Sequence, residues 1–358
     1  MAPLVKVFLK NPSFETKVCV TAQHREMLDQ VLDFFEIVPD YDLNLMKPGQ
    51  NLYGLTADII TGLQSVLEDF KPDYAYVHGD TTTTMGASIA SFYSGAKVCH
   101  VEAGLRTFNK KAPFPEEINR TITGHIADYH FAPTQTSFDN LINESIKPEN
   151  VLITGNTVID ALFESVSRVD DLKDDEIEHL KKEIDFSKRI VLVTGHRREN
   201  HGQGFINICA ALKEIGESAE NVQIIYPVHL NPKVQKPVYE ILGNQENVKL
   251  IAPLAYPAFV WLMNKAELVI TDSGGVQEEA PSLGKPVLVM RDTTERPEAV
   301  EAGTVILVGT DKDKIVKETL RLLNDTELYA KMSKLHNPYG DGKACEKIVE
   351  FIENLDNE

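Results

Sequence analysis

The stretch Thr271-Asp-Ser-Gly-Gly-Val-Gln-Glu-Glu-Ala-Pro-Ser-Leu-Gly-Lys-Pro-Val-Leu-Val-Met-Arg-Asp-Thr-Thr-Glu-Arg-Pro-Glu298 decides the fold that we expect for this chain. It follows the run Glu267-Leu-Val-Ile270, which is typical of a buried parallel strand. The strand is expected to end at Asp272-Ser-Gly-Gly275, where a helix begins. Backbone N–H groups at a helix start are free, and glycines place no side chain in the way. This turn therefore predicts a binding site for phosphate oxygens.

Charged residues farther along the same stretch extend the prediction from a phosphate to a nucleotide. Glu278 and Glu279 fall about one helical turn after the glycines, where a carboxylate can accept two hydrogen bonds from a ribose diol. A second strand, Pro286–Met290, is expected to bring Arg291 and Arg296 to the same edge. Together these residues favour a nucleotide diphosphate site, for a nucleotide sugar. For the glycine pair alone, an ordinary glycine-rich turn is the alternative.

The composition excludes several classes of protein. The 358 residues allow two domains of ordinary size. With 36 basic and 54 acidic residues the formal net charge is −18, which argues against nucleic acid or an anionic membrane as a partner. No run is long and apolar enough for a transmembrane helix, and the N-terminus lacks the pattern of a signal peptide. The four cysteines are scattered without a Cys-x-x-Cys pair, so we expect free thiols and a cytoplasmic protein.

Short apolar runs alternate with helix-period segments along the whole chain, which predicts repeated βαβ units and parallel sheets. The weakly apolar, acidic segment 165–187 is the expected domain boundary. We therefore predict an α/β fold with two Rossmann-like, doubly wound domains, 1–165 and 166–335, that face a central cleft in a glycosyltransferase-B-like arrangement. Residues 342–358 are expected to form a helix that packs back on the first domain. The expected strands are 16–21, 74–78, 97–101, 129–132, 151–154, 189–194, 222–226, 248–251, 268–271, 287–289 and 304–308.

The start of the first domain departs from this pattern. The second domain opens with a clear strand, 189–194, whereas the first opens with the helix-like stretch Pro3–Leu9. A right-handed βαβ unit needs a strand before such a helix. We therefore expect the first domain to lack its first strand.

Three carboxylates are expected at one edge of the first sheet. Asp80 follows the strand 74–78, Glu102 follows the strand 97–101, and Glu116 lies at a helix start after a proline-rich loop. Several carboxylates in one cleft are typical of sites that move protons onto and off carbon or a glycosidic oxygen. The alternative for Asp80 is a helix cap. A metal site is the rival interpretation of all three, and it is weaker because no histidines lie at metal-ligand spacing.

Basic residues follow two strands of the second domain. His196, Arg197 and Arg198 come directly after the strand 189–194, where His196 can change charge near neutral pH and the arginines suit phosphate. His229 follows the strand 222–226, either as a cleft residue or as a structural histidine.

Several long segments together resemble the non-hydrolysing UDP-N-acetylglucosamine 2-epimerases. The matching segments are HGDTTTT (78–84), HVEAGLRT (100–107), PFPEEINR (113–120), TGNTVIDAL (154–162), TGHRREN (194–200), YPVHLNP (226–232), the opening stretch (271–298) and NPYGDGKA (337–344). The resemblance implies interconversion of UDP-N-acetylglucosamine and UDP-N-acetylmannosamine without a cofactor or metal, for cell-surface polysaccharide, by a homodimer. UDP would leave C1 while a carboxylate takes the C2 proton. The resulting 2-acetamidoglucal would be reprotonated on its other face.

The resemblance also implies roles for particular residues. The implied acid and base groups are Asp80, Glu102 and Glu116, with His196 assisting the departure and return of UDP. The implied substrate-binding residues are Arg106, Arg197, Ser273, Gly274, Gly275, Glu279 and Arg296. A possible regulatory site would use Gln23, Arg197 and His229.

The resemblance leaves one departure and several alternatives. The family has an N-terminal strand and a Gly-Thr-Arg-Pro-Glu segment before the stretch that matches Met1–Val5, so a chain that begins here is expected to be poorly stable and weakly active. A hydrolysing 2-epimerase, an epimerase of a modified UDP-sugar and a non-catalytic UDP-sugar-binding protein remain alternatives.

Overall fold

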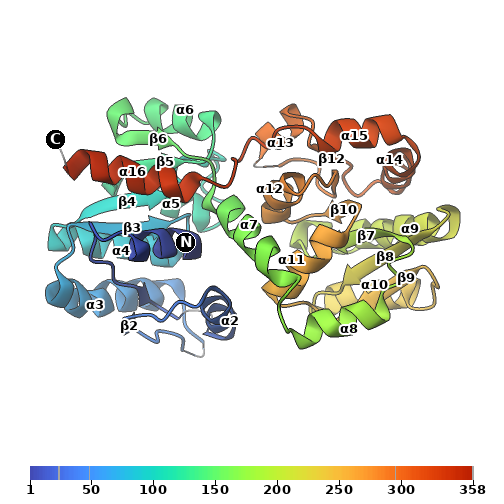
Figure 1. Ribbon diagram of the computed structural model, residues 1–358, viewed down its shortest axis with the longest axis horizontal. Coiled ribbons are helices and arrows are strands. Elements are labelled where there is room, and N and C mark those ends of the chain that lie inside the picture. Colours follow the sequence, from blue (N-terminus) through green and yellow to red (C-terminus); the bar gives the residue numbers. More distant parts are fainter. Residues whose placement is uncertain (23–24, 48, 295, 357–358) are drawn as a thin grey trace. The chain divides into compact units, whose positions relative to one another are not determined.

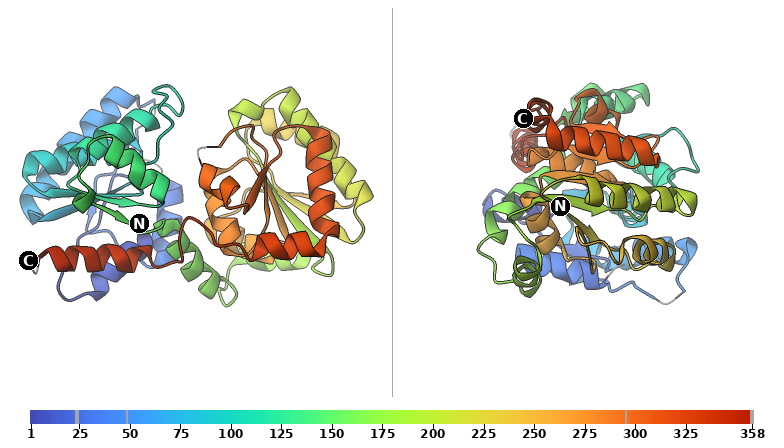
Figure 2. Two further views of the ribbon diagram at one scale, coloured as in Figure 1. Left: turned by 90° about the horizontal axis from the view of Figure 1, so that it is seen from above. Right: turned by 90° about the vertical axis from the view of Figure 1, so that its right-hand side faces the viewer.

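The chain folds into two compact α/β units in the computed structural model, which describes residues 1–22, 25–47, 49–294 and 296–356. The first unit comprises Met1–Ala161 and Tyr339–Glu358, and the second comprises Leu162–Pro338. The chain passes from the first unit to the second within helix α7 (Thr157–Val169), which contains the expected boundary at residue 165. Figures 1 and 2 show both units.

The second unit contains a parallel sheet of six strands in the order β12-β11-β10-β7-β8-β9. The strands are β7 (Arg189–Thr194), β8 (Val222–Pro227), β9 (Val248–Ile251), β10 (Leu268–Thr271), β11 (Val287–Val289) and β12 (Val305–Leu307). This order is that of a doubly wound dinucleotide-binding fold, in which ligands bind beyond the carboxyl ends of the strands where the strand order reverses. Here the order reverses between β7 and β10, so the segments after these two strands flank the expected ligand position.

Helices cover both faces of this sheet (Figure 1). They are α8 (Asp175–Glu183), α9 (Gln203–Ser218), α10 (Pro232–Leu242), α11 (Tyr256–Lys265), α12 (Gly274–Ser282), α13 (Pro297–Glu301), α14 (Lys312–Asn324) and α15 (Thr326–Ser333). Val191 and Val193 of β7 pack with α9, α10 and α14 in one core cluster. Ile190 and Leu192 alternate with them and are equally buried, because successive strand residues point to opposite faces of the sheet.

The first unit contains a four-stranded parallel sheet in the order β3-β4-β5-β6 and a separate two-stranded parallel sheet, β1-β2. The strands are β1 (Cys19–Val20), β2 (Tyr41–Asp42), β3 (Tyr74–His78), β4 (Lys97–Val101), β5 (Tyr129–Ala132) and β6 (Val151–Ile153). Strand β2 was not expected, because its two residues are too few to form an apolar run. Among the described residues, β1 pairs with β2 alone and β3 with β4 alone.

The helices of the first unit pack around its two sheets (Figure 1). They are α1 (Ala2–Lys10), α2 (Arg25–Phe35), α3 (Leu52–Phe70), α4 (Thr82–Ser94), α5 (Glu116–Ile126), α6 (Gln135–Asn143), part of α7, and α16 (Ala344–Asp356). Helices α1 and α16 share one core with Cys99, Val101 and Phe131. Asp160 of α7 anchors α16, because its carboxylate accepts the N–H groups of Cys345 at 2.9 Å and Ala344 at 3.3 Å.

Candidate active site

Asp80 lies in the turn that joins β3 to α4. Its neighbour Thr81 caps the helix, with a hydroxyl that accepts the N–H of Thr84 at 3.2 Å. Asp80 is therefore not the cap, and its carboxylate pairs instead with Arg120 at 2.5 Å. His100 lies beneath the turn, with Nε2 2.8 Å from the Gly79 carbonyl oxygen. The position of Asp80 is thus fixed by the ion pair with Arg120 and by the contact of His100, a residue of β4, with the turn that contains Asp80.

Arg120 contacts the proposed acid Asp80 and was not among the site residues expected from the sequence. Its side chain is 7% exposed, and its guanidinium also contacts Glu117 at 3.2 Å. Its neighbour Asn119 donates to the Asp80 carbonyl at 2.9 Å. The PFPEEINR segment places Arg120 one helical turn after Glu116, but the partner Asp80 is 40 residues away along the chain. Only the tertiary structure could identify this pair.

Two successive glutamates at the start of α5 have different environments. Glu117 is 3% exposed and accepts the backbone N–H groups of Thr107 and Phe108, so it holds the preceding loop in place. Glu116, which we expected to act in proton transfer, has a buried carboxylate oxygen, Oε2, without a hydrogen-bond partner among the described residues. A buried carboxylate oxygen without such a partner has a free lone pair for a proton, which is the property that a general acid or base needs.

Glu102 follows β4, the neighbour of β3, so Glu102 and Asp80 follow adjacent strands of one sheet edge. Glu102 adopts a left-handed backbone conformation, with φ of 60°, which is uncommon for a residue with a side chain. Its carboxylate lies 3.4 Å from His78 Nε2. Burial lowers the pKa of His78 well below its usual value, and the neighbouring His100 lowers it further. His78 is therefore neutral at pH 7.

Arg106, which we expected to bind substrate, lies in a buried ion pair. Its side chain is 1% exposed and forms a bidentate ion pair with Glu144, at 2.6 and 2.7 Å. The remaining terminal nitrogen donates to the Leu105 carbonyl at 2.7 Å. All three guanidinium nitrogens therefore have protein partners, and the expectation that Arg106 binds substrate does not match this geometry.

In the second unit, His196 and His229 lie together at the carboxyl ends of β7 and β8. Their rings are stacked, with centroids 5.3 Å apart and planes 16° apart. Burial lowers the pKa of His196, and His229 and Arg197 lower it further, while the nearby Asp272 carboxylate opposes the shift. His229 Nδ1 accepts the N–H of Asn231 at 3.1 Å, so Nε2 carries the proton when this ring is neutral. The predicted regulatory residue His229 thus contacts the predicted catalytic residue His196.

The start of α12 has the features expected of an anion-binding site. Helix α12 begins at Gly274, and Ser273 at the cap position makes no side-chain cap bond. A side chain on Gly274 would collide with Arg296, because its Cβ would lie 2.6 Å from Nη1. Arg296 therefore lies directly beside the glycine turn, where it pairs with Glu278 at 2.5 Å. A guanidinium and free backbone N–H groups together suit a diphosphate.

The two glutamates of α12, Glu278 and Glu279, have different environments, like the two glutamates at the start of α5. Glu278 is paired with Arg296, as described above. Burial raises the pKa of Glu279 to about 8, and the charge of Glu278 adds to the effect. Glu279 is therefore largely protonated at pH 7 in the free protein, and a protonated carboxyl can both donate to and accept from a ribose hydroxyl.

Three further expectations concern the rest of the chain. Gln23, assigned to a regulatory site, lies outside the described residues. Within the described ranges, no cluster of three or more His, Cys, Asp or Glu side chains is arranged to hold a metal ion. No helix in that part of the chain is both long and apolar enough to cross a bilayer.

Known proteins match almost the whole length of this chain. A sequence model of the family described as UDP-N-acetylglucosamine 2-epimerase matches residues 6–353. The chain belongs to this family. It is 60% identical over 357 residues to the UDP-N-acetylglucosamine 2-epimerase of Escherichia coli K12, with 99% of this chain and 95% of that protein covered.

Solved structures of family members have the same fold. The UDP-N-acetylglucosamine 2-epimerase of Neisseria meningitidis, solved with UDP-N-acetylglucosamine bound, is 50% identical and superposes with a TM-score of 0.91, covering 99% of this chain and 96% of that one. The enzyme from Methanocaldococcus jannaschii, solved with UDP-N-acetylglucosamine and UDP, is 32% identical with a TM-score of 0.80, covering 99% of this chain and 95% of that one. The expected α/β fold with two parallel-sheet domains is thereby confirmed for this member of the 2-epimerase family.

Proposed function

We propose that this chain interconverts UDP-N-acetylglucosamine and UDP-N-acetylmannosamine without hydrolysis, through elimination and re-addition of UDP. The C2 hydrogen of the sugar is not adjacent to a carbonyl group, so its direct removal is slow. Cleavage of the C1–O bond, with the electron pair leaving on UDP, gives C1 cationic character and acidifies C2–H. A carboxylate takes that proton and the C1=C2 bond of 2-acetamidoglucal forms. Proton return to the opposite face of C2 and attack of UDP on C1 complete the inversion.

The carboxylates of the first unit supply the proton transfers in this proposal. Removal and return of the proton on opposite faces require two groups, and Asp80, Glu102 and Glu116 follow neighbouring elements of one sheet edge. Arg120 holds the Asp80 carboxylate in place through their ion pair, so that it can accept a proton from one face of the sugar. Glu116 has an unpaired, buried oxygen and suits the opposite face.

The second unit holds the leaving group in this proposal. The backbone N–H groups at Gly274 and Gly275 and the guanidinium of Arg296 offset the negative charge that develops on UDP. Glu279 binds the ribose hydroxyls. His196 donates a hydrogen bond or proton to the departing diphosphate.

The observation that carries the proposal is the family match from residue 6 to residue 353, which includes both the acidic and the anion-binding segments. We test it by incubating either UDP-sugar with the protein in deuterium oxide and following C2 by NMR. Deuterium should enter C2 of both epimers, while free N-acetylmannosamine does not accumulate. Products without deuterium at C2 would contradict the mechanism, and release of the free sugar with UDP would identify a hydrolysing enzyme.

Variants of the three carboxylates make this test specific. Replacement of Asp80 by Asn, or of Glu102 or Glu116 by Gln, should lower kcat by about 100-fold or more, the scale of positioned proton transfer. Glu149→Gln is the matched control, because Glu149 is exposed on the same unit. Equal kcat values for all four variants would contradict the assigned roles.

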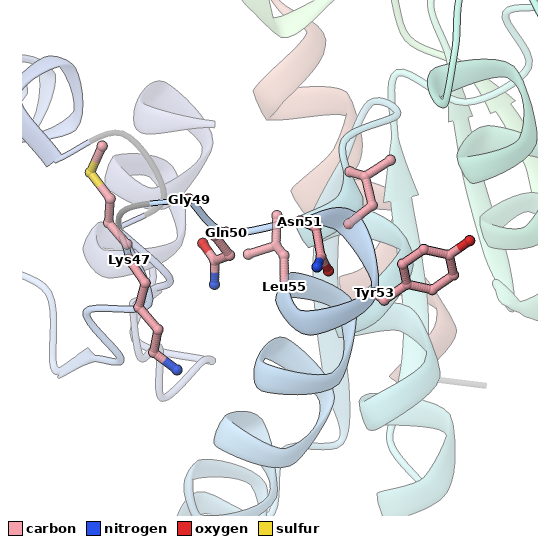
Figure 3. Close-up of a pocket in the computed structure, with 8 residues that line it drawn as sticks. Lys47, Gly49, Gln50, Asn51, Tyr53 and Leu55 are labelled. Atoms are coloured by element: carbon pink, nitrogen blue, oxygen red, sulfur yellow. The ribbon is translucent and has the colours of Figure 1, made fainter.

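We also propose that the chain forms a homodimer through the starts of α3, α4 and α5. A hollow of about 490 Å³ lies there. Tyr53, with 90% of its surface exposed, projects from its rim and also borders a neighbouring hollow of about 620 Å³ (Figure 3). A protruding aromatic beside an apolar hollow is self-complementary, because a two-fold axis lets each copy fill the hollow of the other. The first hollow is lined by Leu52, Tyr53, Thr56, Ala57, Ile60, Thr82, Met85, Pro115, Ile118 and Asn119.

Sedimentation velocity tests this interface. Wild-type protein should sediment as a dimer, and Tyr53→Asp should sediment as a monomer at micromolar concentration. Tyr239→Asp in the second unit is the control, since Tyr239 is 51% exposed but lies outside the proposed interface. A wild-type monomer, or a dimer that tolerates Tyr53→Asp, would contradict the proposal.

The cytoplasm is the compartment that we propose. None of the cysteines forms a disulfide, which is usual where glutathione and thioredoxin keep thiols reduced; they are Cys19, Cys99, Cys209 and Cys345. Fractionation of cells that express the tagged chain, with antibody detection in each fraction, tests this assignment.

A further inference from the structure

Asp272 is a buried carboxylate at the junction of the two loops that form the proposed diphosphate site. It follows β10 directly and is completely buried. The next residues, Ser273 and Gly274, start the anion-binding turn, while its side chain points to the loop after β7. A carboxylate without exposure is costly unless its oxygens accept several hydrogen bonds, so its partners indicate why it is there.

The two carboxylate oxygens of Asp272 have different neighbours. Oδ2 accepts the backbone N–H groups of His196 at 3.0 Å and Arg197 at 2.9 Å, and the Asn200 side chain at 3.2 Å. Asn200 also donates to the Met290 carbonyl at 3.1 Å, which ties the end of β11 to the same cluster. Oδ2 therefore holds the backbone of the His196 loop.

The other oxygen, Oδ1, faces the imidazole ring. It lies 3.7 Å from His196 Nδ1 and accepts the same residue's backbone N–H at 3.2 Å. The first distance exceeds that of a hydrogen bond, but such contacts in ligand-free sites often tighten when substrate binds. A proton on Nδ1 that faces a carboxylate leaves Nε2 as the nitrogen available to a ligand.

We infer that Asp272 is a positioning residue for His196, orienting the imidazole with Nδ1 toward the buried carboxylate and Nε2 toward the leaving diphosphate. The inference rests on the proposed function, in which His196 assists UDP. A buried acid that orients a histidine and stabilises its cation is a recurring arrangement in enzymes. The groups that face the ring are Asp272, His229 and Arg197, and only Asp272 among them favours the protonated form.

The variant Asp272→Asn separates the two roles of this side chain. With the amide oxygen in the place of Oδ2, the hydrogen bonds from His196, Arg197 and Asn200 are kept. The amide NH2 then replaces Oδ1 and presents a donor instead of a charge to His196 Nδ1. A role limited to holding the loop should survive this change, whereas a role in orienting and charging the imidazole should not.

The expected result for Asp272→Asn is a loss in kcat of at least about tenfold, with UDP affinity by calorimetry changed less than about threefold. In a His196→Asn background the same change should alter kcat by less than about twofold, because the residue acts through the histidine. Asp311→Asn, an exposed cap residue in the same unit, is the control. An unchanged kcat for Asp272→Asn, or the same loss in both backgrounds, would overturn the inference.

NMR of labelled histidine tests the inference without relying on activity. In the wild type, the neutral His196 ring should carry its proton on Nδ1, and in Asp272→Asn the pH midpoint of its titration should fall. A proton on Nε2 in the wild type, or an unchanged midpoint in the variant, would contradict the inference. The wild-type spectrum also decides the question if Asp272→Asn does not fold. A failure of C2 exchange would contradict the proposed function alone, since these spectra do not depend on turnover.

Discussion

Arg106 and Arg120 belong to neighbouring segments of the first unit, and both are buried in ion pairs. Arg106 uses all its nitrogens on Glu144 and a carbonyl group, while Arg120 pairs with Asp80, a proposed proton acceptor. Both follow glutamates along the sequence, Glu102 before Arg106 and the pair 116–117 before Arg120. The difference in role follows from the partner, and the partner is set by the fold.

Arg106→Ala should destabilise the protein more than it impairs catalysis. The change leaves Glu144 as a partly buried carboxylate without its cation, which typically costs about 3–5 kcal/mol. We expect the free energy of unfolding in urea to fall by this amount at pH 7, while KM below the unfolding transition changes less than about threefold. Arg120→Ala, by contrast, should lower kcat through Asp80. A large rise in KM for Arg106→Ala with unchanged stability would restore a substrate-binding role.

Glu279→Gln should change stability in a pH-dependent way. The folded-state pKa of Glu279 is about 8 against an ordinary value of 4.5, so between these pH values the folded protein holds a proton that the unfolded chain releases. Wild-type stability therefore falls as pH rises through this window and levels off above it. Glutamine removes that loss, so the variant should gain on the wild type from pH 5 to pH 8.5, by on the order of 5 kcal/mol at most.

Urea unfolding of both proteins at pH 5 and pH 8.5 measures this difference. Glu149→Gln is a suitable control, because that side chain is exposed. A difference between wild type and Glu279→Gln that is equal at the two pH values would show that the carboxyl is ionised in the folded protein at neutral pH.

Turns at strand ends and helix starts position the reactive groups. The carboxyl ends of β3 and β4 lead into turns with left-handed residues, Gly79 and Glu102. The backbone conformation of these turns sets the direction of the Asp80 and Glu102 side chains. Gly104 continues this segment with φ of 92°, and a Cβ there would lie 2.1 Å from the Ser137 carbonyl oxygen. The loop before α5 is then held by the Glu117 carboxylate.

Helix α16 depends on one side chain of another helix for its N-terminal cap. Asp160→Ala removes the carboxylate that accepts the N–H groups of Ala344 and Cys345, a loss that usually costs about 0.5–2 kcal/mol. Hydrogen exchange of the α16 amides should become faster, while exchange in β7 and β10 of the second unit stays unchanged. Asp139→Ala, at an exposed position of α6, serves as the control. Unchanged exchange in α16 would mean that its apolar face alone holds it.

The two units differ in how the chain builds them. The second unit is one continuous segment with a complete six-stranded sheet and its own core. The first unit takes its last helix from the end of the chain, so its core closes only when Cys345, Ile348 and Ile352 are present. The net charge of the whole chain is −18. Any local positive potential that attracts an anionic substrate must therefore come from individual buried and half-buried arginines.

The fragment 157–338 should therefore fold by itself. It retains all six strands of the second sheet and the residues proposed to bind UDP. We expect a cooperative urea transition and UDP binding by calorimetry, without deuterium exchange at the C2 position of the UDP-sugar. The complementary fragment 1–156, which lacks α16, is the comparison and should not unfold cooperatively. Loss of UDP binding in a folded fragment would show that the first unit contributes to the nucleotide site.

Short-range patterns of this chain were sufficient to predict the parallel strands and the α/β class. The expected ranges 74–78, 97–101, 129–132, 189–194, 248–251 and 268–271 coincide with β3, β4, β5, β7, β9 and β10. Apolar periodicity and turn residues are properties of a few neighbouring residues, and buried parallel strands follow from them. The same signals placed Asp80, Glu102 and Ser273 at strand ends, where ligands of such sheets bind.

The pairs that give these residues their chemistry are decided by tertiary structure. Asp80 and Arg120 are 40 residues apart along the chain, Arg106 and Glu144 are 38, and His196 and Asp272 are 76. Parallel strands are joined by long crossovers, so residues that meet at one sheet edge are far apart along the chain and no local pattern connects them. Sequence periodicity could therefore identify the reactive side chains. Only the folded sheet determines which charged partner neutralises or orients each of them.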